Sequence, residues 1–357
     1  MSHSRFIREI FLATTSNDSP SSSMTQEHQI LLANGRKFSA DAENSILDNA
    51  LRQGVALEHS CKNGRCGVCK TQLLNGQTEV LQHEESLQEA EKQAGFILTC
   101  CRKALANVEI DAEDLPELQG IQTKTIPARI DSLKFLTSSV VQVVLRTPPN
   151  NTLQFLPGQY ISVIGPNGTR RAYSVANAPR VDHKIVLHIK KVEQGVLSQY
   201  WFEQAKVNDL LRLEGPMGTF FLRDQLPQTL ILLATGTGLA PIQALLEKLQ
   251  ALAQQGQTLP KIAVYWGNRH EQDIYCELPV QHISGVEAHL VLSRPEQGWA
   301  GRTGYVQQAV LQDFGNLQNA ALYACGSGSM IASAKAALLQ AGLPDNRFYS
   351  DAFVSTN

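Results

Sequence analysis

The sequence predicts a multidomain fold in which three units follow one another: a small α+β unit, an antiparallel β-barrel and an α/β unit with a parallel sheet. Three observations predict this order. A hairpin and helix pattern precedes a cysteine-rich loop, closely spaced β-branched segments come next, and short apolar strands alternate with helices from Thr229 onward. A chain of 357 residues is long enough to bury two or three separate cores.

The first unit begins with a hairpin followed by a helix. Apolar and polar residues alternate over 28–40 around Asn34-Gly35, a dipeptide that suits a type I′ turn. Ser45 can cap a helix that Gly54 ends. The apolar positions of this helix, which follow the 3.6-residue period, are Ile46, Leu47, Ala50 and Leu51.

Four cysteines of this unit have the spacing of an iron-sulfur site. Cys61, Cys66 and Cys69 stand in C-x4-C-x2-C spacing and Cys100 follows, which is the plant-type [2Fe-2S] pattern. Glycines between the cysteines let the backbone approach the cluster and point N–H groups at its sulfur atoms. A zinc site or isolated buried thiols are the alternatives, but three spaced cysteines with a distant fourth favour the cluster.

A fifth cysteine, Cys101, directly follows Cys100. Two adjacent residues of a strand point to opposite sides, so one of these thiols can face the cluster and the other packs as a small buried side chain. We expect Cys100 to be the ligand.

The second unit contains β-branched segments typical of an antiparallel barrel, at 127–134, 138–147, 159–164 and 185–191. The run Arg171-Ala-Tyr173-Ser174 follows a turn at 166–168 and resembles a motif of the ferredoxin-reductase flavoprotein family. On composition alone, a Tyr-Ser pair in a barrel strand is more often simple packing.

The resemblance implies a flavin site, and FAD is favoured over FMN. Arg171 would pair with a phosphate, Tyr173 would pack on the isoalloxazine and Ser174 would lie near its reactive N5. Gly195 and Ser198 match a family Gly-x-x-Ser that places backbone N–H groups against the flavin pyrophosphate.

In the third unit a glycine-rich turn lies between an apolar strand and a long helix. Its residues Gly236, Thr237 and Gly238 allow a pyrophosphate to approach the helix N-terminus. Segments 265–269 and 323–326 should emerge at the same carboxyl edge of the parallel sheet.

The family resemblance implies further roles in this unit. Cys325, followed by Gly326, would lie beside the nicotinamide and help to position the hydride, although a buried strand cysteine is the plain alternative. Ser174 and Cys325 are thus the candidate catalytic residues, and Phe353 resembles a terminal aromatic near the flavin. Ser293-Arg294 resembles a pair that holds the 2′-phosphate of NADPH, yet similar residues occur in NADH-type members; we favour NADH over NADPH.

Composition limits location and partners. The net charge of −2 gives no reason to bind nucleic acid, and no apolar run approaches the ~20 residues of a membrane span. Seven cysteines, three of them within nine residues, fit metal-bound thiolates in a reducing cytoplasm better than disulfides.

We place the unit boundaries by composition. Residues 19–23 are rich in Ser and Pro, so a disordered tail or a misplaced start codon is favoured over a transit peptide. A linker with acidic residues and proline separates the first two units. The expected ranges are 1–24 for the tail, 25–118 for the [2Fe-2S] unit (β-grasp-like), 119–226 for the FAD barrel and 227–357 for the NAD(P) unit.

The first unit is the acidic one. It carries nine Lys or Arg against fifteen Asp or Glu, a net of −6 that leaves +4 on the rest. We expect it to dock on a basic surface, either of its own chain or of a partner.

The order of the units resembles reductases that serve oxygenases and deoxysugar dehydrases. Several stretches resemble the CDP-6-deoxy-3,4-glucoseen reductases, whose partner is an iron-sulfur, pyridoxamine-dependent sugar dehydrase: 97–101, 116–118, 214–221, 323–327 and 350–354. The resemblance implies hydride transfer from NAD(P)H to FAD, then single electrons to the cluster and an acceptor protein. The alternatives are an oxygenase or hydroxylase reductase and a redox-sensing carrier, which would need no competent nicotinamide site.

Overall fold

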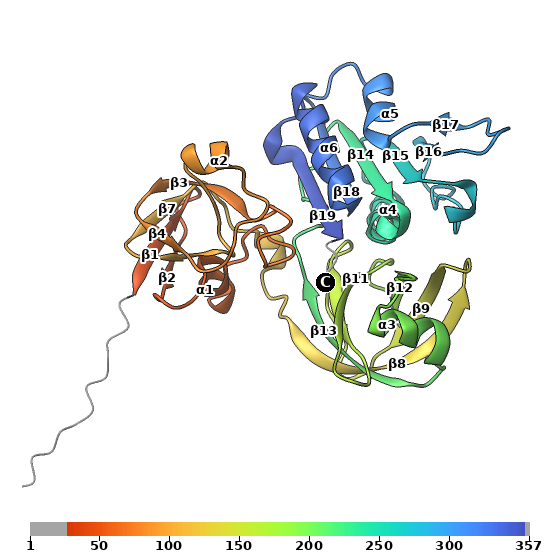
Figure 1. The fold of residues 1–357 in the computed structure, drawn as a ribbon, viewed down its shortest axis with the longest axis horizontal. Coiled ribbons are helices and arrows are strands. Elements are labelled where there is room, and N and C mark those ends of the chain that lie inside the picture. Colours follow the sequence, from red (N-terminus) through yellow and green to blue (C-terminus); the bar gives the residue numbers. More distant parts are fainter. Residues whose placement is uncertain (1–26, 354–357) are drawn as a thin grey trace, which may run out of the picture.

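The computed structural model describes residues 27–353, in which three large sheets follow one another along the chain and a two-stranded sheet of β4 and β6 accompanies the first (Figure 1). The expectation of a disordered tail at 1–24 lies outside the described residues. The elements of the first unit are β1 His28–Leu32, β2 Lys37–Ala40, α1 Ile46–Arg52, β3 Lys70–Asn75, β4 Thr78–Val80, α2 Glu89–Gln93, β5 Phe96–Leu98, β6 Arg102–Ala104 and β7 Val108–Ile110. Five of its strands pair in the order β2-β1-β7-β3-β5, and β1 and β7 run parallel, so the predicted α+β unit is confirmed.

The first hairpin is confirmed, but the predicted type I′ turn is wrong. Gly35 has a φ of 82°, whereas Asn34 is not among the residues with positive φ. The backbone N–H of Leu32 donates to the carbonyl of Arg36 at 2.9 Å, which closes a three-residue loop with only the glycine in the left-handed region. The side-chain amide of Asn34 instead donates to Asp114 at 2.5 Å, so a distant contact decides the turn.

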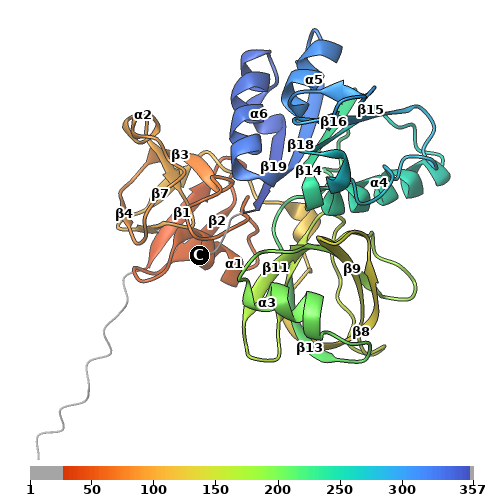
Figure 2. The same ribbon diagram turned by 45° about the vertical axis from the view of Figure 1, so that its right-hand side comes forward.

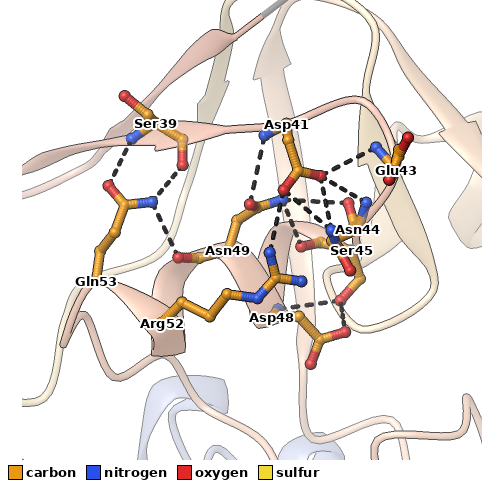
Figure 3. Close-up of polar contacts among 9 residues, drawn as sticks. All are labelled: Ser39, Asp41, Glu43, Asn44, Ser45, Asp48, Asn49, Arg52 and Gln53. Atoms are coloured by element: carbon orange, nitrogen blue, oxygen red, sulfur yellow. Dashed lines mark hydrogen bonds and ion pairs between the residues drawn. The ribbon is translucent and has the colours of Figure 1, made fainter. Parts of the chain in front are cut away.

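The loop before α1 is fixed by short-range hydrogen bonds (Figure 3). Ser45 caps the helix as predicted and accepts from the backbone N–H of Asp48 at 3.0 Å. Asp41 accepts from the backbone N–H groups of Glu43 at 3.0 Å and Asn44 at 2.8 Å. Although burial acts in the opposite direction, the side-chain amide of Asn44, which also donates to Asp41, and these backbone bonds lower the pKa of Asp41 to about 2. A rigid α1 therefore leads into the cysteine-rich loop.

The second unit is an antiparallel barrel, as predicted. Its strands pair in the order β11-β10-β13-β8-β9-β12, and a bridge between Val175 and Leu187 joins the two outer strands. The elements are β8 Lys124–Phe135, β9 Val140–Arg146, β10 Tyr160–Ile164, β11 Arg170–Ser174, β12 Ile185–Lys190, α3 Val196–Gln199, η2 Tyr200–Gln204 and β13 Leu210–Met217.

The third unit is a parallel sheet in the order β17-β16-β15-β14-β18-β19, with helices on both faces. Helix α4 packs on the face that carries Leu230 and Leu232, whereas α5 and α6 cover the face of Ile231 and Leu233. The predicted α/β unit is thus confirmed. The principal elements are β14 Thr229–Thr235, η3 Gly236–Gly238, α4 Leu239–Gln254, β15 Lys261–Asn268, β16 Val286–Leu292, β17 Arg302–Thr303, α5 Val306–Asp313, β18 Ala320–Ser327, α6 Gly328–Gln340 and β19 Phe348–Phe353.

The three units meet at one junction (Figure 2). In both views the last strand, β19, runs toward the place where the first unit approaches the barrel. Among the helices of residues 27–353, none is long and apolar enough to span a bilayer.

Candidate cofactor sites

The predicted cluster ligands lie together as two pairs of thiols. The backbone N–H of Cys66 donates to Cys61 Sγ at 3.3 Å, and the Sγ atoms of Cys69 and Cys100 are 3.2 Å apart. Within the described chain, no group of three or more His, Cys, Asp or Glu side chains is arranged to hold one metal ion, as a single zinc site would require. Two pairs suit two irons that each take two thiolates, so the donor set fits a [2Fe-2S] cluster better than a single zinc ion.

The loop around these thiols needs glycine. Gly64 has a φ of 77°, and a Cβ on it would lie 2.3 Å from the carbonyl oxygen of His83. The close approach lets backbone N–H groups point at sulfur. The hydrogen bond from Cys66 lowers the pKa of the Cys61 thiol to about 6, with burial opposing this and the backbone N–H groups of Asn63 and Arg65 adding to it.

Cys100 and Cys101 lie in the turn between β5 and β6, not on a strand as expected, and Cys101 contacts the second pair through Cys100. Its sulfur is 3.5 Å from that of Cys100 and 3.8 Å from the carbonyl oxygen of His83, and the side chain is buried. Cys100 is the member of this doublet that approaches Cys69. The placement favours Cys100 as the ligand.

The predicted flavin residues lie on β11, at the edge of the barrel. Arg171 is exposed and donates to the carbonyl of Arg170 at 2.9 Å, and in residues 27–353 its guanidinium has no carboxylate partner. Ala172 beside it is exposed as well, so this end of β11 is open for a ligand. A free guanidinium on an open strand fits a phosphate group.

The other flavin candidates have structural partners of their own. Tyr173 packs edge-on against Trp201 with ring centres 6.3 Å apart, and its hydroxyl accepts from the Trp201 indole at 3.0 Å. Ser198 accepts from the backbone N–H of Val192 at 2.8 Å, and Gly195 caps the short helix α3. The contacts of Ser198 and Gly195 fix the conformation of the loop that is expected to contact the flavin pyrophosphate.

The glycine-rich turn of the third unit is packed against the end of β18. A Cβ on Gly238 would lie 2.3 Å from the carbonyl oxygen of Cys325, and a Cβ on Gly326 would lie 2.1 Å from Thr235 Oγ1. Only glycine allows the two loops to approach so closely. The indole of Trp266 also donates to the carbonyl of Gly236 at 2.9 Å. This bare backbone cradle at the carboxyl edge fits a dinucleotide pyrophosphate.

Ser293 and Arg294 emerge at the same edge. The backbone N–H of Ser293 donates to the carbonyl of Asn268 at 3.0 Å, and that of Arg294 to the carbonyl of Arg269 at 2.8 Å. Both arginines are exposed, and within the described residues neither guanidinium has an ion-pair partner. The two side chains leave positive charge available beside the carboxyl edge of the sheet, where the nucleotide is expected to bind.

The two candidate catalytic residues are joined by an aspartate. Asp351 of β19 is the register partner of Cys325 and accepts from Ser174 Oγ at 3.2 Å. Phe353, two residues later, is 40% exposed and pairs with Ser327. The structure therefore brings Ser174 and Cys325 to one place beside Asp351, whereas Arg171 and Arg294 are exposed.

Asp351 is not among the predicted site residues, although it stands within the stretch 350–354 that resembles the family. Asp351 is 5% exposed and also accepts from Ser60 Oγ of the first unit, at 2.7 Å. A lone acid among apolar residues of the terminal strand was the available signal. Nothing in the sequence marks Ser60 except its place before Cys61.

Comparisons with known proteins agree with this arrangement. Three family models match: a 2Fe-2S iron-sulfur cluster binding domain at 31–105, an oxidoreductase FAD-binding domain at 127–222 and an oxidoreductase NAD-binding domain at 232–336. A CDP-6-deoxy-L-threo-D-glycero-4-hexulose-3-dehydrase reductase of Yersinia pestis is 42% identical over 322 residues, covering 89% of this chain and 95% of the relative.

More distant relatives share the same architecture. The phenol hydroxylase P5 protein of Acinetobacter pittii is 32% identical, covering 90% of this chain and 92% of its own. A solved cytochrome P450 reductase of Amycolatopsis matches with a TM-score of 0.70 and 26% identity, covering 91% of this chain and 98% of that one. The chain therefore belongs to the ferredoxin-reductase family of iron-sulfur flavoproteins and is an NAD(P)H-dependent oxidoreductase that passes electrons through FAD and a [2Fe-2S] cluster.

Proposed function

We propose that this reductase supplies electrons to a deoxysugar dehydrase of the kind served by the Yersinia relative. The observation that carries this proposal is the margin of identity, 42% against 32% for the phenol hydroxylase protein over nearly the same length. The alternative acceptor is an oxygenase or hydroxylase, which the phenol hydroxylase relative represents. A carrier without nicotinamide chemistry is disfavoured by the glycine cradle.

We assign the cofactor contacts as follows. When bound, the nicotinamide, FAD and cluster would supply hydride transfer and its conversion into single-electron steps. The cluster would be held by Cys61, Cys66, Cys69 and Cys100; FAD by Arg171, Tyr173, Ser174, Gly195 and Ser198, with Phe353 nearby; and the nucleotide by Gly236, Thr237, Gly238, Ser293, Arg294 and Gly326.

Cys325 has a positioning role in this proposal. It is fully buried, and burial raises the pKa of its thiol well above the usual range. A thiol that stays protonated is a poor nucleophile, but its small side chain could pack against the nicotinamide ring. The hydroxyl of Ser174 donates its hydrogen to Asp351 at 3.2 Å, so its oxygen would accept a hydrogen bond at the flavin edge.

NADH remains the proposed nucleotide, and the exposed charges of Arg269 and Arg294 make NADPH the second candidate. The cysteines of the described chain are free thiols, which supports a cytoplasmic location. Charge also supports the expected docking of the acidic first unit, because its Glu58 forms an ion pair with Arg223 of the barrel.

Two experiments test the proposal. Anaerobic mixing with one equivalent of NADH or NADPH should bleach the flavin and iron-sulfur bands with the true nucleotide. Purified CDP-6-deoxy-hexulose-3-dehydrase should then be reduced faster than a phenol hydroxylase, with a rate that falls as salt rises. Faster reduction of the hydroxylase would overturn the acceptor assignment, and a salt-insensitive rate would count against acidic docking.

A further inference from the structure

The segment that leads into the first cluster cysteine is attached to both other units. Residues 58–60 directly precede Cys61, and His59 and Ser60 are buried. We call this segment, with its partners Tyr160, Thr219, Arg223 and Asp351, the interdomain contact. Its position matters because the covalent chain from Ser60 continues at once into a predicted ligand.

On the barrel side, the contact is made by backbone and side-chain hydrogen bonds. The backbone N–H of His59 donates to Thr219 Oγ1 at 3.0 Å, and the backbone N–H of Thr219 donates to the carbonyl of His59 at 3.2 Å. Glu58 accepts from Thr219 Oγ1 at 2.7 Å and pairs with Arg223. The segment is thus attached to the barrel through both its backbone and its side chains.

Ser60 is held at both its backbone and its side chain. Its carbonyl accepts from the hydroxyl of Tyr160 at 2.8 Å, and its own hydroxyl donates to Asp351 Oδ1 at 2.7 Å. Gly218 makes room for this tyrosine, since a Cβ there would lie 2.8 Å from the ring. A donor from the barrel and an acceptor from the nucleotide unit therefore fix one residue next to the cluster loop.

Asp351 connects this residue to the other two cofactor sites. Its second oxygen accepts from Ser174, a predicted flavin contact, and its register partner on β18 is Cys325. A carboxylate that is 5% exposed needs these hydroxyl donors, because a buried acceptor without a partner is costly. The Asp351 side chain thereby links Ser60, which precedes the first cluster cysteine, to the flavin candidate Ser174, while its strand pairs with that of Cys325.

We propose that Ser60 is a positioning residue for electron transfer, which holds the cluster loop against the flavin barrel through Asp351 and Tyr160. The proposal rests on the proposed function. Each hydride brings two electrons, which must cross this contact one at a time while the hydrogen leaves as a proton. Single-electron rates fall steeply with distance, so a loosened contact slows this crossing and leaves hydride transfer to the flavin unchanged.

The first test measures the contact itself, without turnover. In the holoprotein, hydrogen exchange at the backbone amides of His59 and Thr219 reports how often the contact opens. Ser60→Ala leaves one buried oxygen of Asp351 without its hydrogen-bond donor, so exchange should quicken by roughly tenfold. Tyr160→Phe weakens the contact from the barrel side and should act in the same direction. Ser39→Ala and Tyr305→Phe, which lie outside the contact, should leave both amides protected.

The second test separates the two electron steps. Rapid mixing with NADH, followed by flavin absorbance and by freeze-quenched paramagnetic resonance of the reduced cluster, should give Ser60→Ala normal flavin reduction and slower cluster reduction. Ser60→Thr keeps the hydroxyl and should restore the rate.

Three results would overturn the proposal: unchanged exchange at both amides in Ser60→Ala and Tyr160→Phe, faster exchange with unaltered cluster reduction, or an equal slowing of both steps. Failure of the proposed function is distinguishable, because the acceptor assignment fails only in assays with an added dehydrase or hydroxylase, whereas both tests here use the reductase alone.

Discussion

The Sγ atoms of Cys69 and Cys100 lie 3.2 Å apart although the two residues are 31 positions apart in the chain. The reason is the antiparallel pairing of β3 with β5, which places Lys70 opposite Leu98. Cys69 ends the cysteine-rich loop just before β3, and Cys100 comes just after β5. The sheet therefore brings the distant fourth thiol to the other three.

This geometry predicts unequal effects for the two adjacent cysteines. Cys100→Ser should greatly lower the iron and sulfide content, because a thiolate ligand is replaced, whereas Cys101→Ser should keep the cluster. Iron analysis and the visible spectrum of the purified proteins measure this. Loss of the cluster in Cys101→Ser with retention in Cys100→Ser would reverse the ligand assignment.

Arg171 should contribute to flavin affinity. Because its guanidinium has no carboxylate partner in the described chain, Arg171→Ala should leave the barrel folded and weaken FAD binding by roughly tenfold or more. Fluorescence titration of the flavin-free protein gives the dissociation constant. Arg129→Ala is the control, since Arg129 lies on the same barrel and donates to the carbonyl of Asn208. If both variants lost FAD affinity equally, Arg171 would not be a specific contact of the flavin phosphate.

Gly238 should be intolerant of a side chain. Its φ of −60° suits any residue, so the obstacle to Gly238→Ala is the contact with the Cys325 carbonyl. We expect about 1–3 kcal/mol of lost stability and a raised KM for the nucleotide. Gly328→Ala is the matched control because nothing lies within 4 Å of its added Cβ. Normal KM and stability in Gly238→Ala would show that the turn can move without cost.

Arg294 should distinguish the two nucleotides. Its side chain is exposed beside Arg269 and could contact the extra phosphate of NADPH. Arg294→Ala should therefore lower kcat/KM for NADPH by roughly tenfold and change that for NADH little. Steady-state rates with ferricyanide as acceptor measure both. If kcat/KM fell equally for NADH and NADPH, Arg294 would contact a group that both nucleotides contain and not the 2′-phosphate.

Local patterns predicted most of the elements because their causes are local. The Ser45 cap, the β-branched barrel strands and the glycine turn before α4 each depend on neighbouring residues. The turn at Asn34 was predicted wrongly because its side chain binds Asp114, 80 positions away. The link between Ser60 and Asp351 could not be predicted at all, since 291 positions separate the pair and no periodicity relates them.

The junction of barrel and nucleotide unit should make stability depend on pH through His188. This side chain is 6% exposed, lies 3.2 Å from the hydroxyl of Tyr275 and 3.3 Å from the amide of Gln142, and burial lowers its pKa from 6.5 to about 4. Between those values the unfolded chain binds a proton that the folded chain does not. The free energy of unfolding therefore falls as pH drops from about 6.5 toward 4, by about 2 kcal/mol at pH 5.

Replacing the histidine should flatten this dependence. Denaturant unfolding at pH 7 and pH 5 should show a smaller difference for His188→Gln than for the unmodified protein, because the ionisable group is gone. The exposed His282 provides the control, and His282→Gln should retain the full difference. A histidine with a lowered pKa takes up its proton only when the protein unfolds, and glutamine cannot take up this proton. If His188→Gln loses as much stability between pH 7 and pH 5 as the unmodified protein does, His188 is therefore not the group responsible.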